Sequence, residues 1–448
     1  MQLCLVVAVF VSWLSVDFAP AGRAEWAAWK LSAVMMCHLV VVLAAWAMTR
    51  MTLAESNSHL YPDDLVARRF LGRQRWHHAL WICLLICSLA CFDLARVVTQ
   101  LFESLSATAG WPGLATMPLM LRVCVTLPML VSLVLSWSFS FDVEQRLDPE
   151  LTAASRLGHV LTLFRSTLLV PLMAAVVVSG WIESVNYFWP RLVESNWSTV
   201  IHSMPLAFLA FALPTLLVRL WKTSSLPEGA LRRRLERQTA EAGVSVRDIV
   251  VWDTGDRFCN AAVAGFAPAT RYLLLTDRLL RELSSDEIEL VVMHEMAHVK
   301  HGHNGKMLLA VVGSLTAVCA LLGAAGNLNS GSQLTLAVAI ALGVPVIAGM
   351  SAWLICRYAR LLEFQADLWA AQKSGDAVAY LRVIGAMSGG EPDATDWLHP
   401  SFSHRCTFLA NGTVSAAALI RSQLQLSSLA LFGWIGVSLL LAAILVTH

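Results

Sequence analysis

The sequence predicts a mainly α-helical, polytopic integral membrane protein with about nine transmembrane helices and one small α+β domain. Of its 448 residues, 57% are hydrophobic and only 14% are charged, whereas soluble domains carry about 25% charged residues. Many apolar runs approach the roughly 20 residues needed to cross a bilayer. Residues 222–306, in contrast, have the mixed composition of a soluble domain. The net charge of +1 argues against a nucleic-acid partner, because such domains are usually strongly basic.

Nine apolar runs are the expected membrane spans. They are residues 3–18, 31–48, 79–98, 114–139, 167–182, 201–221, 307–325, 334–356 and 429–446. The first run is short, and a cleaved signal peptide is the alternative, but no Lys or Arg precedes it as a signal peptide requires. The chain therefore divides into an N-terminal region of about six spans (1–221), a polar segment (222–306), a hairpin of two spans (307–356), a second polar segment (357–425) and a C-terminal span (426–448).

Basic residues set the expected orientation of these spans. Residues 50–78 contain five arginines and residues 140–166 contain three, whereas residues 102–113 contain no basic residue and residues 326–333 carry no charge. Cytoplasmic loops are the ones enriched in Lys and Arg. Both polar segments, 222–306 and 357–425, are therefore expected on the cytoplasmic side of an inner or plasma membrane.

The first polar segment has local signals for a small α+β domain. An amphipathic helix is expected to end at Gly243, and residues 248–252 and 271–276 are expected to form short strands. Residues 259–265 between them suit an edge strand or an extended loop. Ser284 and Glu287 have the spacing of a capping box, in which each satisfies a backbone N–H at a helix start. They predict a helix that begins there and runs to Gly302.

That helix contains the sequence "HEMAH", in which two histidines lie four residues apart. His294 and His298 therefore share a helix face, about 5–6 Å apart at Cβ, and both imidazoles can reach one metal ion. Glu295 is displaced around the helix, so it can act on a water molecule beside the ion without binding the ion. This is the H-E-x-x-H pattern of zinc peptidases. The alternative is a helix whose histidines only face solvent.

A hydrolytic zinc site needs a third protein ligand and an open fourth position. Glu363 and Asp367 lie four residues apart in a helical pattern, so Glu363 can complete the ligand set. Asp367 can accept the other ring N–H of a metal-bound histidine. The two spans of the hairpin 307–356 return the chain to the side that it left. Glu363 therefore emerges on the same side of the membrane as the two histidines.

With these residues identified, the chain resembles the membrane-embedded zinc metallopeptidases of the HtpX and CaaX prenyl protease type, which are gluzincins. The matching stretches are "NAAVAG", "LLLTDRLL", "SSDEIELVVMHEMAHVKHGH", "RLLEFQAD" and "HPSFSHR". The resemblance implies a zincin-like domain that holds one Zn²⁺ per chain through His294, His298 and Glu363. It also implies that Glu295 is the general base and that Asp367 supports the site.

The resemblance further implies that Asn260 begins an edge strand that pairs with the substrate backbone. An extended substrate is expected to add to that edge, with Asn260, Ala261 and Ala262 as binding residues. His399 is the candidate for stabilising the tetrahedral oxyanion, and the alternative is that His399 and the proline after it only form a rigid turn. Arg405 is expected to make a structural ion pair.

The predicted function is zinc-dependent hydrolysis of peptide bonds in membrane or membrane-associated proteins at the cytoplasmic face. A CaaX-type protease for prenylated proteins is one alternative. A membrane-bound sensor with a zinc protease domain is another, although such proteins usually add an extracellular ligand-binding domain. An inactive scaffold would be expected to have a broken motif, and a transporter would need paired polar sites on discontinuous helices. The motif here is intact, and although Pro171, Pro205 and Pro214 could kink the spans that contain them, no internal repeat is visible.

Overall fold

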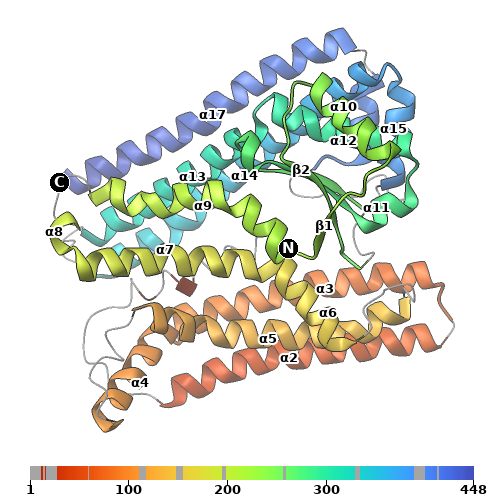
Figure 1. Ribbon diagram of the computed structural model, residues 1–448. Helices are drawn as coiled ribbons and strands as arrows, with labels where there is room; N and C mark the ends of the chain where they lie inside the picture. The colour runs from red at the N-terminus through yellow and green to blue at the C-terminus, as the bar shows by residue number, and fades with distance from the viewer. Residues whose placement is uncertain are drawn as a thin grey trace. The chain divides into compact units, whose positions relative to one another are not determined.

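A computed structural model describes residues 12–13, 16, 28–58, 60–109, 118–147, 155–193, 198–255, 259–327, 333–387, 399–410 and 413–447. The chain forms two compact units (Figure 1). Unit 1 comprises residues 1–222 and 254–257, and unit 2 comprises residues 223–253 and 258–448.

Unit 1 is helical throughout its described residues. Its α-helices are α2 (Ala28–Asn57), α3 (Asp63–Ile86), α4 (Leu94–Ala109), α5 (Pro118–Leu147), α6 (Arg156–Leu163), α7 (Leu169–Phe188), α8 (Pro190–Val193) and α9 (Ser198–Leu220). π-Helical turns at Cys87–Cys91 and Phe164–Leu168 follow α3 and α6. Helix α2 packs against α3 and α5. Buried apolar side chains, among them Trp81 and Met129, form the core between these helices.

Within the described residues, four helical segments are long and apolar enough to cross a membrane. They are Trp29–Asn57, Pro118–Leu147, Arg156–Phe188 and Ala417–Ile444. The pair Asp63–Leu89 and Leu94–Leu105, bent by 52°, makes a fifth if it counts as one span. Several of the expected spans therefore have a helical counterpart, whereas the expected count of nine is not reached. Most of the expected first span, 3–18, lies outside the described residues.

Unit 2 contains a four-stranded sheet of order β1-β2-β4-β3. Its strands are β1 (Thr223–Ser225), β2 (Asp248–Trp252), β3 (Ala261–Ala264) and β4 (Tyr272–Thr276). Strands β2 and β4 are parallel, and β1 and β3 pair antiparallel at the two edges. Strands β2, β3 and β4 lie where the sequence predicts them, and β3 is an edge strand. Strand β1 was not expected, because three residues are too few to show an alternating pattern.

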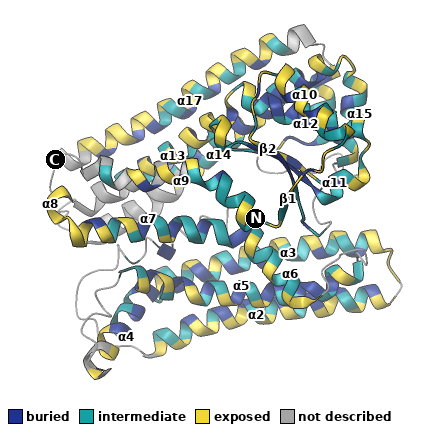
Figure 2. Cartoon of the chain, in the orientation of Figure 1, coloured by how far each residue is buried: buried dark blue, intermediate teal, exposed yellow. Residues whose placement is uncertain are grey.

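Helices α10 (Ala230–Glu241), α11 (Asp277–Glu282) and α12 (Ser285–Lys300) accompany the sheet. Leu235 of α10 and Val292 and Met296 of α12 are fully buried with Leu273 and Leu275 of β4. Figure 2 shows this buried cluster around β2 and α12. Burial of about 25 cal/mol per Å² of apolar surface holds α12 against the sheet and fixes which of its faces remains available for polar side chains.

The rest of unit 2 is helical: α13 (His303–Asn327), α14 (Gln333–Ser374), α15 (Ala377–Met387), α16 (Phe402–Ala410) and α17 (Thr413–Thr447). Helices α13, α14 and α17 pack against one another. The expected span 334–356 and the polar helix after it are one uninterrupted helix, α14. The expected C-terminal span likewise extends back to Thr413 in α17. Large apolar side chains such as Leu429 (72% exposed) are exposed on α17, which suits a lipid-facing helix. Figure 2 shows that much of α17 is exposed.

Candidate active site

Helix α12 places His294 and His298 on one face because its start is fixed. Ser284 accepts a hydrogen bond from the Glu287 N–H, and the Glu287 carboxylate accepts one from the Ser284 N–H, so the capping box is complete. The helix ends at Lys300, and the capping residue His301 is followed by Gly302 at a φ of +66°, the left-handed conformation typical of a glycine after a helix. The two imidazoles project from the intervening turn, and His294 is buried.

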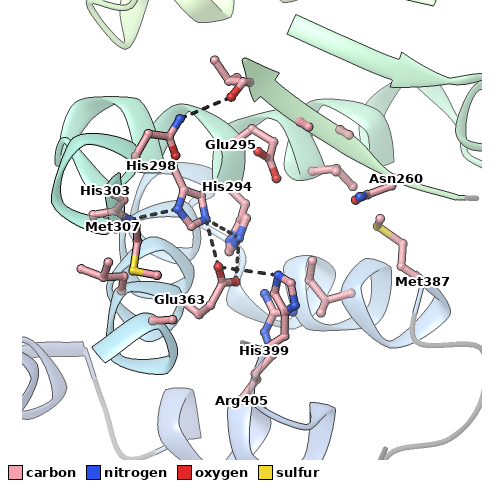
Figure 3. Close-up of a pocket in the computed structure, with 18 residues that line it drawn as sticks. Asn260, His294, Glu295, His298, His303, Met307, Glu363, Met387, His399 and Arg405 are labelled. Carbon is pink, nitrogen blue, oxygen red and sulfur yellow. Dashed lines mark hydrogen bonds and ion pairs between the residues drawn. The ribbon is translucent and has the colours of Figure 1, made fainter. Parts of the chain in front are cut away.

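The structure brings His294, His298 and Glu363 together (Figure 3). The two Nε2 atoms lie 3.1 Å apart, the His294 Nε2 atom lies 3.4 Å from one Glu363 carboxylate oxygen, and the His298 Nε2 atom lies 3.4 Å from the other. One ligand atom from each residue lies within 4.8 Å of the others, and ligands on a tetrahedral ion with bonds of roughly 2.0–2.1 Å are separated by about 3.3–3.4 Å. The three residues are therefore close enough to share one metal ion, and the two-histidine, one-carboxylate donor set is one that zinc uses in hydrolases.

The second ring nitrogen of His294 is held by residues from two other helices. Its Nδ1 atom lies 3.1 Å from an Asp367 oxygen and 2.9 Å from the Tyr380 hydroxyl. Tyr380 donates to the same Asp367 oxygen at 2.6 Å, and the Arg405 Nε atom donates to the other oxygen at 2.8 Å. Asp367 has no exposed surface. This buried network orients the His294 ring so that its Nε2 atom faces Glu363.

The ring of His298 is held in the same way by His303. Their Nδ1 atoms lie 3.0 Å apart, and the His303 Nε2 atom lies 3.0 Å from the Gln365 side-chain oxygen. His303 is only 1% exposed. A proton on Nδ1 of His298 and one on Nε2 of His303 satisfy every contact and leave the His298 Nε2 atom free to bind a metal. The same arrangement is common around metal-bound histidines.

Sequence reasoning missed Tyr380 and Gln365, and it gave His303 no role beyond helix capping or packing. Gln365 and His303 had a detectable signal, because each lies near a predicted ligand in the chain. No sequence signal marked Tyr380. It lies on α15, which begins only after the turn at Gly375, and the composition around it is ordinary. His301 stacks on His303 and does not join the three ligand atoms.

Charge and burial shift the titration of these groups in opposite directions. Burial alone lowers the pKa of His294, but hydrogen bonds to Asp367 and Glu363 outweigh it and raise that pKa to about 10. Burial and the neighbouring His294 lower the pKa of His298 to about 4. Burial opposes ionisation of Glu363, yet its contacts with the histidines lower its pKa to about 2. A metal ion would therefore meet an ionised Glu363 and a neutral His298, and would displace a proton from His294.

Glu295 points from α12 toward β3, beside the two histidines (Figure 3). Burial raises the pKa of its carboxyl to about 7, and a hydrogen bond from the backbone N–H of Val263 is among the interactions that oppose the rise. A pocket of about 380 Å³ lies in front of the three ligand atoms. Asn260, Ala261 and Ala262 line it from the edge of the sheet. The pocket is thus lined by three residues that could bind a metal ion, by a carboxyl group with a pKa of about 7 and by the edge strand β3.

His399 also lines the pocket, with its Nε2 atom 3.9 Å from a Glu363 oxygen. Its side chain is 56% exposed, so it is accessible to a molecule bound in the pocket. Arg405 contacts the pocket too, but its guanidinium group is committed to Asp367. Residues 388–398, which precede His399 in the chain, lie outside the described residues.

Comparisons with known proteins agree with this geometry. Residues 225–413 match the sequence profile of Peptidase family M48. A protease HtpX of Xanthomonas oryzae is 28% identical over 215 residues, which are 41% of this chain and 73% of that protein. A protease HtpX of Haemophilus ducreyi is 27% identical over 151 residues, 32% of this chain and 52% of that protein. The chain thus spans only about half the length of the latter relative.

A CAAX prenyl protease 1 homolog of Oryza sativa is 36% identical over 93 residues, which are 20% of this chain and 22% of that protein. Among solved structures, Ste24p of S. mikatae has a similar fold with a TM-score of 0.55 and 17% identity. That similarity covers 87% of this chain and 99% of Ste24p. The resemblance to the HtpX and CaaX prenyl protease type that the sequence predicts is therefore confirmed.

Proposed function

We propose that this chain is a membrane-embedded zinc metalloendopeptidase that hydrolyses peptide bonds in membrane or membrane-associated proteins. The observation that carries the proposal is the convergence of His294, His298 and Glu363, with ligand atoms within 4.8 Å of one another, beside the buried carboxyl group of Glu295. When bound, zinc would polarise the scissile carbonyl and make the attacking water more acidic. The match to Peptidase family M48 supports the same activity.

Glu295 is the proposed general base and then general acid. A group that takes a proton from water and later releases it to an amine works best when its pKa is near the working pH. Burial brings the pKa of Glu295 to about 7, which meets this condition. Glu295 points toward β3 and lies beside the two histidines (Figure 3), so the base is near both the strand edge and the proposed metal ligands.

The edge of β3 is the proposed binding site for an extended substrate, because an exposed strand edge offers unpaired N–H and C=O groups. Asn260, Ala261 and Ala262 would contact the substrate there. His399 is the proposed oxyanion donor, since its side chain is exposed and lines the pocket beside the ligand set. Asp367 is the proposed support of His294 and, with Arg405, the buried anchor of the site.

We further infer that the chain crosses the membrane about nine times and that the site is cytoplasmic. Helices α9, α13 and α14 cover the expected spans 201–221, 307–325 and 334–356, and the arginine-rich loops are those expected inside. An epitope inserted at the exposed turn around Gly375 should then be accessible in inverted vesicles only. Accessibility in right-side-out vesicles would reverse the orientation.

The experiment that tests the activity uses the purified full chain in nanodiscs. Zinc content and cleavage of an internally quenched peptide library are measured for the wild type and for Glu295→Gln. We expect one zinc per chain in both, and a loss of cleavage of roughly 10²- to 10⁴-fold in the variant, the usual contribution of a general base. Glu289→Gln, a change of an acid on the same helix outside the pocket, is the matched control. Full cleavage by Glu295→Gln would remove Glu295 from the chemistry.

A CaaX-type protease is the second candidate, because the fold similarity to Ste24p extends beyond the catalytic segment to 87% of the chain. It predicts that a C-terminal prenyl cysteine peptide is cleaved better than the same peptide without the lipid. Equal rates for the two peptides would favour the broader membrane endopeptidase.

A further inference from the structure

We propose that Asn304 is a specificity-determining residue. Its side-chain amide donates a hydrogen bond to the Val263 carbonyl of β3, which would otherwise accept a hydrogen bond from an extended substrate. The inference rests on the proposed peptidase function and defines the class of peptide that the site accepts. Such a peptide pairs with β3 through Ala261 and needs no backbone N–H opposite Val263. Proline or the end of the peptide is therefore tolerated at that position.

The pairing of β3 with β4 determines which backbone groups face the open edge. The Thr276 N–H donates to the Asn260 carbonyl at 3.0 Å, and the Asn260 N–H donates to the Thr276 hydroxyl at 2.9 Å. Asn260 therefore faces β4. In an antiparallel pair, alternate residues direct both backbone groups toward the partner strand. Ala262 then also faces β4, and Ala261 and Val263 present their N–H and C=O groups to the pocket side.

The two outward-facing residues differ in what already occupies them. The Asn304 Nδ2 atom donates to the Val263 carbonyl at 3.3 Å. The Val263 carbonyl is thus engaged by a side chain of the protein. Within the described part of the chain, the backbone groups of Ala261 have no such partner. Of the two residues, Ala261 is therefore the one whose carbonyl is available to a substrate.

The position of Asn304 is set by the metal-ligand network. It follows His303, whose ring is buried and fixed between His298 and Gln365. The backbone of Asn304 is therefore held in place, while its side chain is exposed and lines the pocket. A carboxamide N–H is the same kind of donor as a peptide N–H. Asn304 consequently supplies the bond that a substrate residue opposite Val263 would make.

Pairing with both residues would extend a substrate by about 7 Å along β3, since a strand rises roughly 3.4 Å per residue. A substrate strand of this length has to displace Asn304 and gains no net hydrogen bond at the Val263 carbonyl. The net contribution of one hydrogen bond corresponds to about a three- to tenfold change in affinity. In the wild type, a longer substrate strand does not gain this increase in affinity. It gains the increase when the Asn304 amide is removed.

The test uses the full chain in nanodiscs and a quenched peptide that the wild type cleaves at one defined bond. Each backbone amide of the peptide is N-methylated in turn, and KM and kcat are measured for the wild type, Asn304→Ala and Asn304→Ser. We expect the parent peptide to show a three- to tenfold lower KM with both variants and an unchanged kcat. N-methylation of one amide, the one opposite Val263, should restore the wild-type KM in the variants and have no effect in the wild type.

Several outcomes decide the proposal. N-methylation of the amide that pairs with Ala261 should raise KM in every form of the protein. Lys306→Ala, a change of an exposed residue on the same helix, should keep the wild-type pattern. If the wild type cleaves the peptide, and both Asn304 variants show the wild-type N-methylation profile, the role of Asn304 is overturned while the peptidase stands. If the wild type cleaves no peptide of the library with zinc bound, the proposed function itself fails.

Discussion

Asp367→Asn provides a quantitative test of the buried network behind His294. The change keeps the size of the side chain and removes its charge, which leaves the guanidinium group of Arg405 without a counter-ion. Asp367 has no exposed surface and the Arg405 side chain is only 13% exposed. Removing one partner of a buried ion pair costs about 3–5 kcal/mol. For a unit of this size, about 3 kcal/mol corresponds to a fall in Tm of roughly 6–12 °C.

The assay is thermal unfolding of the zinc-free protein in detergent, together with a competitive zinc titration. We expect the lower Tm without zinc and, separately, a zinc affinity lower by about 10- to 100-fold, since Asp367 orients His294. Tyr380→Phe is the matched comparison, because it removes one hydrogen bond to the same carboxylate and leaves the ion pair intact. A zinc-free Tm within 2 °C of wild type for Asp367→Asn (about 1 kcal/mol or less) would refute the claim that this pair stabilises the fold.

Three further predictions concern the ligand set and its packing. Glu363→Ala should lower zinc content from one per chain to a small fraction, measured by atomic emission, because two histidines remain where three ligands are needed. His303→Ala should weaken zinc binding by about tenfold in a competition assay, since it leaves His298 without the partner that orients its ring. Gly385→Ala should destabilise the protein by about 1–3 kcal/mol in denaturant unfolding, because a Cβ atom there would meet the Phe402 ring at 2.8 Å.

Matched variants separate these effects from general damage. His301→Ala should leave zinc affinity unchanged, because His301 is not among the ligand atoms; an equal loss in His301→Ala and His303→Ala would argue against a specific role of His303. Gly433→Ala lies in α17, where a Cβ atom meets nothing within 4 Å, and it should be neutral or stabilising. Full zinc occupancy in Glu363→Ala would remove that residue from the ligand set.

The local parts of the site could be predicted because they follow from helical spacing. The four-residue interval places His294 and His298 on one face, and the capping box fixes where that helix begins. Glu363 was predicted as the third ligand because the two crossings of the expected hairpin 307–356 would return the chain to the same side, an argument from the number of spans that needs no coordinates. These features depend on regular geometry, which a sequence expresses directly.

The remaining parts depend on tertiary contacts that leave no periodic signal. Tyr380 reaches His294 from 86 residues further along the chain, and nothing in its neighbourhood marks it. The continuity of α14 was hidden because the composition changes from apolar to charged near Arg357 while the helical backbone continues. Strand β1 exists only through its pairing with β2. In each case the deciding interaction is with a distant segment, and the conformational preference of the local sequence does not predict it.

Because α14 is one continuous helix, its rotation about its axis determines the orientation of the site residues that it contains. Glu363 and Asp367 lie on the same 42-residue helix that contains the expected span 334–356, so no loop separates the proposed third ligand from the apolar segment. A helix turns by about 100° per residue, and the rotation of α14 about its axis therefore fixes the direction of both carboxylates together. Asp367 is locked to Arg405 and Tyr380, which prevents that rotation. The buried pair thus sets the direction of Glu363 as well as that of His294, and the ligand geometry is held by rigid elements, which position a site more precisely than loops can.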